Sequence, residues 1–369
     1  MPLTCFKFYI ISQNSASVLY ILFCIGISVH ILNLSFHFIA NKTKSRYNKS
    51  ANLIQFAERT FMEHKQQSLF FDIETTGLSA DISAITLIGC CDMDGNITQW
   101  FNEDGFSQKQ ILSDFLSFIK PYDTLITFNG KTFDLLFLTN KIKEFKLDAS
   151  FDNYKHLDLY QILKPYKNLW GLKNFRQKNL EEYLGFHRTD KLSGKKLIKT
   201  YQNYLEKGDT KDKEAVLLHN REDLLGLRNI YSLMSYPALL DGKFTLSSFS
   251  IENDEFTASL NLEHQIPVCC NYEKSGISLF LEHSTAVLTC PLEGGHLKHY
   301  HRDYKNYYYL PMEDLVIHKS MKSFVDTSSL VRADKDNCYS KFVPGDNFLS
   351  NEDDVLGFCS DMIYYLLSK

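Results

Sequence analysis

The chain has 369 residues, more than one typical domain, so two folded units are the expected organisation. Hydrophobic residues make up 44% and charged residues 23%, which indicates a globular protein with a buried core rather than a disordered one. The formal net charge of −4 excludes a uniformly basic nucleic-acid-binding protein, so any contact with a polynucleotide must come from local patches.

Nine cysteines occur at irregular spacings, and no two of them form a CxxC pair. An odd count without paired spacing predicts reduced, mostly buried thiols, with neither a disulfide framework nor a zinc site. We therefore expect a cytoplasmic protein.

The chain begins with an apolar segment that has no Asp, Glu, Lys or Arg between Phe8 and Asn41. Residues 18–40 are long enough to cross a bilayer, and the basic residues that follow them would hold the rest of the chain in the cytoplasm. Two alternatives stay open: a membrane tether through residues 18–40, or an over-extended start with the true protein beginning near Met62.

From Ser68 onward the pattern is that of an α/β domain. Short apolar runs predict strands at 68–73, 84–91, 97–101 and 125–128. Helical spacing predicts helices at 107–120, 132–143, 172–204 with an interruption near 185–194, and 212–234. After Pro237, short strands at 243–251, 255–262, 276–281 and 286–290 predict a β-rich region that ends in a helix from about Asp353. The expected organisation is therefore a linker region 1–61, an α/β domain 62–236 and a smaller β-rich domain 237–369 of unknown role.

The first chemical motif is a pair of carboxylates, Asp72 and Glu74, on an otherwise apolar strand. Residues two apart on a strand share one face, so both carboxylates point to the same side. Buried carboxylates need a partner, and a divalent cation can serve both. The alternative is that the two residues cap a turn or pair with lysines.

The second motif follows the strand at 125–128. Asn129-Gly130 ends the strand, and Asp134 falls in the first turn of the next helix, where the helix dipole favours a negative charge. Taken alone, Asp134 has two readings, a metal ligand or plain helix-terminus electrostatics.

The third motif is His219 and Asp223 on the long helix 212–234. Positions i and i+4 lie on one helix face, so the two side chains project together. An Asp in this position can bind a metal while the His accepts a proton from water. Exposed His–Asp pairs without a function are also common.

Together and in this order, the three motifs resemble those of the DEDD (DnaQ-like) 3′–5′ exonucleases, which have a ribonuclease-H-like fold. Asp72 and Glu74 match the first motif, Asp134 the second and Asp223 the third. In the histidine subclass the His usually precedes the Asp by five residues. Here His219 precedes it by four, the place of a Tyr in family-B polymerase proofreading domains, so the third motif is intermediate between the two subclasses.

Residues 69–234 also resemble the YprB-type ribonuclease-H-like family. The similarity lies in the His-x-Asp-Leu of His156–Leu159, in the spacing of Arg188, Asp190 and Gly194, and in the third motif. The resemblance implies a ribonuclease-H-like mixed sheet flanked by helices, with the β-rich region as an addition to it.

The resemblance implies a metal-dependent nuclease that hydrolyses DNA or RNA with two divalent ions, Mg²⁺ or Mn²⁺. The ligands would be Asp72, Glu74, Asp134 and Asp223, with Asp72 bridging, and His219 would be the general base. Substrate-binding candidates are Thr75, Asn129, Lys131 and Arg188, and Asp158 is expected to play a supporting role. Alternatives are a catalytically silent nucleic-acid-binding module, a two-metal enzyme acting on nucleotides, and a non-catalytic interaction protein tethered to a membrane through the N-terminal segment. The oligomeric state is not predicted.

Overall fold

The structure is a computed structural model that describes residues 68–325 and 327–368. The expected region 1–61 and the alternatives for residues 18–40 therefore lie outside the described residues. Within the described ranges, no helix has both the length and the apolar character needed to span a bilayer. The described residues form one compact unit.

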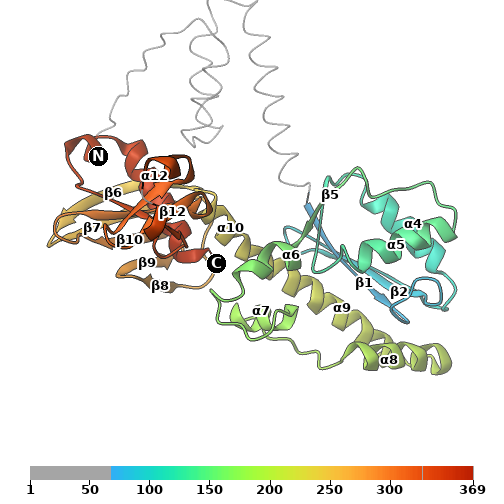
Figure 1. Ribbon diagram of the computed structural model, residues 1–369. Helices are drawn as coiled ribbons and strands as arrows, with labels where there is room; N and C mark the ends of the chain where they lie inside the picture. The colour runs from blue at the N-terminus through green and yellow to red at the C-terminus, as the bar shows by residue number, and fades with distance from the viewer. Residues whose placement is uncertain (1–67, 326, 369) are drawn as a thin grey trace, which may run out of the picture. The chain divides into compact units, whose positions relative to one another are not determined.

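A mixed five-stranded sheet organises the first half of this unit (Figure 1), and its strand order is β3-β2-β1-β4-β5. The strands are β1 (Ser68–Thr75), β2 (Ile85–Asp92), β3 (Ile97–Phe101), β4 (Thr124–Thr127) and β5 (Lys155–Asp158). β1 to β3 pair antiparallel, whereas β4 and β5 run parallel to β1. The expected strands are thus confirmed, and β1 is the central strand.

Side-chain alternation along β1 assigns its two faces to different helices. Leu69, Phe71 and Ile73 pack with α4 (Gln108–Phe118) and α5 (Asp134–Glu144), whereas Phe70 belongs to the cluster that includes the apolar residues of α9 (Thr210–Ile230). Asp72 and Glu74 have the same parity as Phe70 and therefore face α9. The sheet is consequently covered by helices on both faces (Figure 1). The two carboxylates lie between β1 and α9, where they contact Asn220 and His219.

The connection between β5 and α9 contains α6 (Leu159–Leu163), η1 (Lys164–Tyr166), α7 (Gln177–Tyr183) and α8 (Gly194–Lys207). α7 and α8 both pack against α9. The expected helix from Leu172 begins only at Gln177, because Arg176 is extended and the residues before it follow an irregular path. Trp170, which is 5% exposed, packs edge-to-face on Tyr236 and fixes that path.

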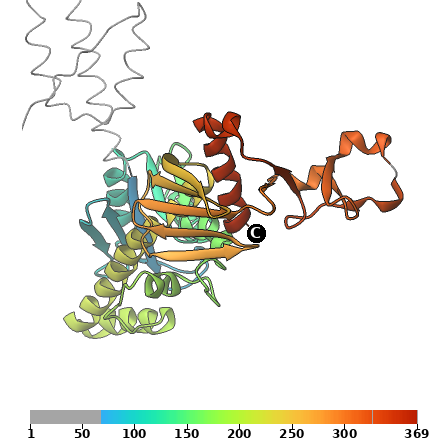
Figure 2. The ribbon, with the colours of Figure 1, turned by 90° about the vertical axis from the view of Figure 1, so that its left-hand side faces the viewer.

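The C-terminal half contains a second, antiparallel sheet of five strands in the order β6-β7-β10-β9-β8. These strands are β6 (Phe244–Glu252), β7 (Glu255–Leu262), β8 (Cys270–Lys274), β9 (Ile277–Glu282) and β10 (Thr285–Pro291). Helix α12 (Glu352–Leu367) contacts this sheet (Figure 2). The β-rich character expected after Pro237 is confirmed, although Pro237 itself lies inside α10 (Ser235–Leu240).

Smaller elements complete the C-terminal half. β11 (Leu297–Tyr300) pairs with β15 (Tyr339–Phe342), and β12 (Tyr307–Leu310) lies between β13 (Leu315–His318) and β14 (Val331–Arg332). The remaining short helices are η2 (Tyr231–Met234), η3 (Tyr304–Asn306), η4 (Lys319–Phe324), η5 (Thr327–Ser329) and α11 (Asp346–Leu349).

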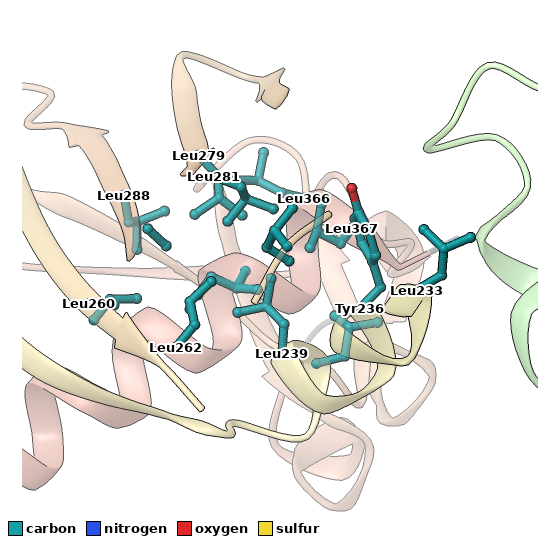
Figure 3. Close-up of a cluster of buried hydrophobic side chains, with 14 of the residues drawn as sticks. Leu233, Tyr236, Leu239, Leu260, Leu262, Leu279, Leu281, Leu288, Leu366 and Leu367 are labelled. Carbon is teal, nitrogen blue, oxygen red and sulfur yellow. The ribbon is translucent and has the colours of Figure 1, made fainter. Parts of the chain in front are cut away.

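One continuous apolar core joins the two sheets. Tyr236 and Leu239 of α10 lie among side chains from the second sheet and from α12, including Leu260, Leu281 and Leu366 (Figure 3). Burying side chains of this size contributes about 1.5–3 kcal/mol each. The C-terminal half therefore stabilises the end of the helix that carries His219 and Asp223, while the domain boundary expected between 236 and 237 stays a prediction.

Candidate functional site

β1 and α9 approach closely at Asp72. The side-chain amide of Asn220 donates a hydrogen bond of 2.9 Å to Oδ2 of Asp72 and accepts one of 2.9 Å from Gln99. Gly89, which pairs with Asp72 across the sheet, makes room for this contact. A Cβ atom at position 89 would lie 1.9 Å from Oδ1 of Asn220, so only glycine fits without a shift. Asn220 thus sets the orientation of the Asp72 carboxylate.

Asp134 is the first residue of α5 and is only 5% exposed. Its Oδ1 accepts a hydrogen bond of 3.2 Å from the backbone N–H of Ile73, which lies between Asp72 and Glu74. This bond brings the second motif beside the first. The favourable charge at the helix N-terminus therefore does not by itself explain the position of Asp134, because the side chain also contacts β1.

Asp158, at the end of β5, holds the turn that leads to Asp134. Its carboxylate is 1% exposed and accepts hydrogen bonds from the backbone N–H groups of Asn129 (2.8 Å), Lys131 (3.2 Å) and Tyr160 (3.1 Å). Asn129 has a φ of 67°, a left-handed conformation that Asn tolerates better than most residues. Asp158 therefore acts on the site through the backbone.

His219 and Asp223 project from α9 toward Glu74. Nε2 of His219 lies 3.3 Å from Oδ2 of Asp223 and 3.9 Å from Oε1 of Glu74. The single turn of helix between the two residues produces this geometry, as their spacing predicted. The other ring nitrogen, Nδ1, lies 2.6 Å from Oδ2 of Asp190. A proton on Nδ1 that is donated to Asp190 leaves Nε2 with a free lone pair directed into the site.

A short segment before α8 is tied to α9 through Glu222. The Glu222 carboxylate accepts hydrogen bonds from the backbone N–H groups of Thr189 (3.0 Å) and Asp190 (2.8 Å), and from the Thr189 hydroxyl. These bonds fix the backbone at Asp190 and so place its carboxylate against His219. Glu222 and Asp223 are neighbours in the sequence. Glu222 hydrogen-bonds the segment before α8, whereas Asp223 faces the site.

Arg188 bridges α7 and α9. Its guanidinium group contacts Glu181 through two nitrogens and reaches Asp223 with the third, Nη1, which is within ion-pairing distance but lacks hydrogen-bond geometry. The Arg188 side chain is only 6% exposed. Gly226 allows Glu181 to approach, since a Cβ there would lie 2.0 Å from Oε1 of Glu181.

The carboxylates repel one another. Burial raises the pKa of Asp72 well above its ordinary value, and the charges of Glu74, Asp134 and Asp223 raise it further. Burial likewise raises the pKa of Glu74, as do the charges of Asp223, Asp134 and Asp190, while Arg188 opposes the shift. Burial raises the pKa of Asp134 to about 7, against the lowering effect of its backbone hydrogen bonds. Burial and the neighbouring charges thus make the charged forms of Asp72, Glu74 and Asp134 unfavourable.

The donor set fits divalent cations. Ligand atoms of Glu74, His219 and Asp223 lie within 4.8 Å of one another, and they form a candidate metal-binding group among the described residues. Carboxylate oxygens suit Mg²⁺ and Mn²⁺, and an imidazole nitrogen suits Mn²⁺ better than Mg²⁺. A cation here would offset the repulsion among buried carboxylates. Asp72 and Asp134 lie outside this trio but act on it electrostatically.

The four substrate-binding candidates differ in placement. Lys131 is exposed, and Asn129 is half-buried in the turn that Asp158 holds. The Thr75 hydroxyl donates to the backbone oxygen of Gly77 at 2.7 Å. Arg188 is buried against two carboxylates. Substrate contact by these four residues stays a prediction.

Sequence reasoning missed several residues that shape the site: Asp190, Asn220, Glu222, Glu181 and Gln177. In the sequence, Asp190 belongs only to a spacing that resembles the YprB-type family. Its contact with His219 could not be predicted from the pattern, because 29 positions separate the two residues. Gln177 donates to the backbone oxygen of Asp223 at 2.7 Å from 46 positions away. One signal in the sequence could have indicated these contacts: a polar residue, Asn220, stands at an internal position of a packed helix.

A mixed five-stranded sheet, with carboxylates from β1, α5 and α9 meeting beside it, defines an α/β protein with a ribonuclease-H-like, nuclease-type fold. Residues 69–235 match the family model RNase_H_2, of the RNase H superfamily. A comparison with curated proteins finds no match.

Among solved structures, the family B DNA polymerase of the hyperthermophilic archaeon Pyrobaculum calidifontis is similar, with 18% identity and a TM-score of 0.39. The similarity covers 47% of this chain and 25% of the polymerase, so the chain spans about a quarter of that protein's length.

Proposed function

We propose that this protein is a metal-dependent nuclease of the DEDD type, a 3′–5′ exonuclease that hydrolyses phosphodiester bonds of DNA or RNA. The observation that carries the proposal is the convergence of Asp72, Glu74, Asp134 and Asp223 from three separate motifs. Asp134 accepts a hydrogen bond from the backbone N–H between Asp72 and Glu74, and ligand atoms of Asp223 and Glu74 lie within 4.8 Å of each other. Burial and neighbouring charges raise the pKa values of Asp72, Glu74 and Asp134. Uncompensated, such a cluster destabilises a fold. Its presence in a nuclease-type fold supports a role in holding cations.

The four carboxylates would hold two divalent ions, Mg²⁺ or Mn²⁺, which supply charge neutralisation for the attacking and leaving oxygens. The chain's own contribution is to fix the ligands. Asn220 orients Asp72, the backbone of Ile73 orients Asp134, and Arg188 holds Asp223. Asp158 keeps the turn before Asp134 in place.

His219 is the residue for which two roles fit. With Nδ1 held by Asp190, its Nε2 can accept the proton of an attacking water, which is the role of a general base. The same nitrogen also lies close enough to Glu74 and Asp223 to serve as a metal ligand. We propose the general-base role, which agrees with the resemblance of the third motif to DEDD exonucleases.

The proposal is tested by incubating the full-length chain with end-labelled single-stranded DNA and RNA in Mg²⁺, Mn²⁺ or EDTA. We expect stepwise shortening from the 3′ end that needs a divalent ion and is lost in Asp72→Asn and in Asp223→Asn. Asp148→Asn, which removes an exposed carboxylate on the surface, is the matched control and should cleave normally.

Cleavage that persists in both site variants would reject the carboxylate mechanism. Binding of the oligonucleotide without any cleavage would favour the silent nucleic-acid-binding module instead. Shortening from the 5′ end, or internal cuts, would reject the 3′–5′ exonuclease assignment while leaving a metal-dependent nuclease.

A further inference from the structure

The segment between β5 and α7 differs in charge from the rest of the chain. Residues 159–180 contain five basic residues and no Asp or Glu, whereas the whole chain has 40 basic and 44 acidic residues. The basic residues are Lys164, Lys167, Lys173, Arg176 and Lys178. Within the described part of the chain, none of the five forms an ion pair with a carboxylate. We call residues 159–180 the basic segment.

Both ends of the basic segment are attached to the carboxylate site. At its start, Asp158 holds the turn that leads to Asp134 and also caps α6. At its end, Gln177 donates to the backbone oxygen of Asp223, and Glu181 pairs with Arg188. The backbone of the segment is therefore tied at both ends to residues of the site.

The segment is held in place by aromatic packing. Trp170 is buried against Tyr236, and the backbone oxygen of Leu169 accepts a hydrogen bond from Tyr272 of β8. With its backbone anchored at these points, the segment presents Lys173, Arg176 and Lys178 as exposed side chains. A segment whose backbone is already held in place loses less entropy on binding a polyanion than a free loop does.

Three half-buried aromatic rings belong to this region, one from the residue before Asn129 and two from the basic segment. Phe128, Tyr160 and Phe175 contact one another, with ring-centroid distances of 5.6 Å, 5.5 Å and 6.1 Å. The ammonium group of Lys164 lies 4.8 Å from the Tyr160 ring centroid. Aromatic rings interleaved with unpaired cations are typical of surfaces that bind single strands, because each unpaired base offers a face for stacking and each phosphate a charge.

We propose that the basic segment, with Phe128 beside it, is the surface along which a single-stranded polynucleotide approaches the carboxylate site. The strand would cross the turn at Asn129 and the aromatic trio, and its phosphates would contact Lys173, Arg176 and Lys178. The inference deepens the proposed nuclease function and rests on it for the choice of ligand. It commits to a strand of several nucleotides rather than to a mononucleotide, because the basic residues are spread along the segment from Lys164 to Lys178.

The test measures binding separately from cleavage. Fluorescence anisotropy follows a labelled 30-nucleotide single strand binding to the full-length chain that carries Asp72→Asn, in Ca²⁺, over a series of salt concentrations. Into this background we introduce Lys173→Ala, Arg176→Ala and Lys178→Ala together. The matched control removes three exposed lysines on the opposite face of the sheet, Lys109→Ala, Lys120→Ala and Lys143→Ala.

We expect the triple change in the basic segment to weaken binding at least tenfold and the control triple change by less than twofold. Each lost phosphate contact on a single strand lowers the log–log salt slope by about 0.7, so three lost contacts lower it by about 2. A blunt duplex of the same length should bind at least fivefold more weakly than the single strand.

Equal weakening by the two triple variants would show a general charge effect and overturn the proposal. The proposal would also be overturned if the triple change in the basic segment did not weaken binding, or if the Asp72→Asn protein did not bind the strand at all. Equal affinity for duplex and single strand would overturn its single-strand part. Cleavage is scored separately in the protein without Asp72→Asn. A chain that binds through the basic segment but never cleaves refutes the nuclease, whereas a chain that cleaves but binds without the segment refutes only this inference.

Discussion

Nδ1 of His219 lies 2.6 Å from Oδ2 of Asp190, and this contact selects the tautomer of the imidazole that directs Nε2 toward Glu74 and Asp223. The Asp190 side chain is 3% exposed, so water cannot easily take its place. Partners of this kind, behind a residue that touches the reacting groups, typically change affinity or rate by about 10–100-fold when removed.

Asp190→Asn is therefore expected to lower kcat on a single-stranded oligonucleotide by about 10–100-fold. The cause is the loss of the charge that orients His219, so KM should change little. The matched control is Asp212→Asn, which removes an acidic residue from the first turn of the same helix α9. If Asp190 acts through His219, the change has little further effect in a His219→Ala protein. If kcat in the double variant instead falls by the product of the two single losses, this coupling is contradicted.

Replacing one of the converging carboxylates should stabilise the metal-free fold. Asp72→Asn keeps the shape of the side chain but removes a buried charge that Glu74, Asp134 and Asp223 repel. We expect the unfolding midpoint in EDTA to rise, by about 2–4 °C for each kcal/mol gained. Thermal denaturation followed by circular dichroism measures this, with Asp148→Asn as the control. A midpoint that falls in Asp72→Asn alone would show that the carboxylates do not strain the metal-free protein.

The glycine beside Asn220 should be intolerant of any side chain. Gly89→Ala places a Cβ 1.9 Å from Oδ1 of Asn220 and 2.8 Å from a methyl group of Leu224. Overpacking of this kind typically costs about 1–3 kcal/mol of unfolding free energy. Gly357→Ala, in an open position inside α12, should instead leave stability unchanged or raise it by about 1 kcal/mol. Urea denaturation compares the two variants, and equal effects would refute the close approach of α9 to β2.

A pH-dependent contribution to stability is expected from Asp361 of α12. Burial alone would raise the pKa of Asp361, but hydrogen bonds from His299 and Arg302 outweigh burial and hold it below its ordinary value. A lowered carboxyl pKa stabilises the fold at pH values above the pKa of the unfolded chain, about 3.9, and this stabilisation is lost as the pH falls through the folded value. Asp361→Asn should therefore lower the unfolding midpoint at pH 7.

The pH dependence of the Asp361→Asn effect serves as the control for this prediction. The deficit of this variant relative to the unsubstituted protein should shrink as the pH is lowered from 7 toward 3, measured by thermal denaturation at each pH. A deficit that stays constant over this range would mean that Asp361 stabilises the fold by packing and not by charge.

Much of the α/β fold was readable from local patterns. The alternation around Asp72 and Glu74, the turn signal at Asn129 and the helical spacing of His219 and Asp223 each follow from a few adjacent residues. These signals placed the strands of the first sheet, and the resemblance to DEDD exonucleases implied that the three motifs would meet. The geometry brings them together through Asn220, Ile73 and His219.

The contacts that complete the site could not be read in the same way. Asp190 and Arg188 lie in an irregular segment without periodicity, so their side-chain directions depend on hydrogen bonds to Glu222 and Glu181 on other helices. The start of α7 was misplaced for a similar reason, because Trp170 is drawn into a core shared with Tyr236. Short strands such as β14 carry too few residues to show alternation.

The central claim is that Asp72, Glu74, Asp134 and Asp223 together hold divalent cations. Electron paramagnetic resonance of Mn²⁺ titrated into the full-length protein tests it directly, because bound and free Mn²⁺ give distinct signals. We predict saturable binding in the unsubstituted protein and in Asp148→Asn, and a loss of at least tenfold in affinity in both Asp72→Asn and Asp223→Asn. The same affinity in all four proteins would contradict the claim.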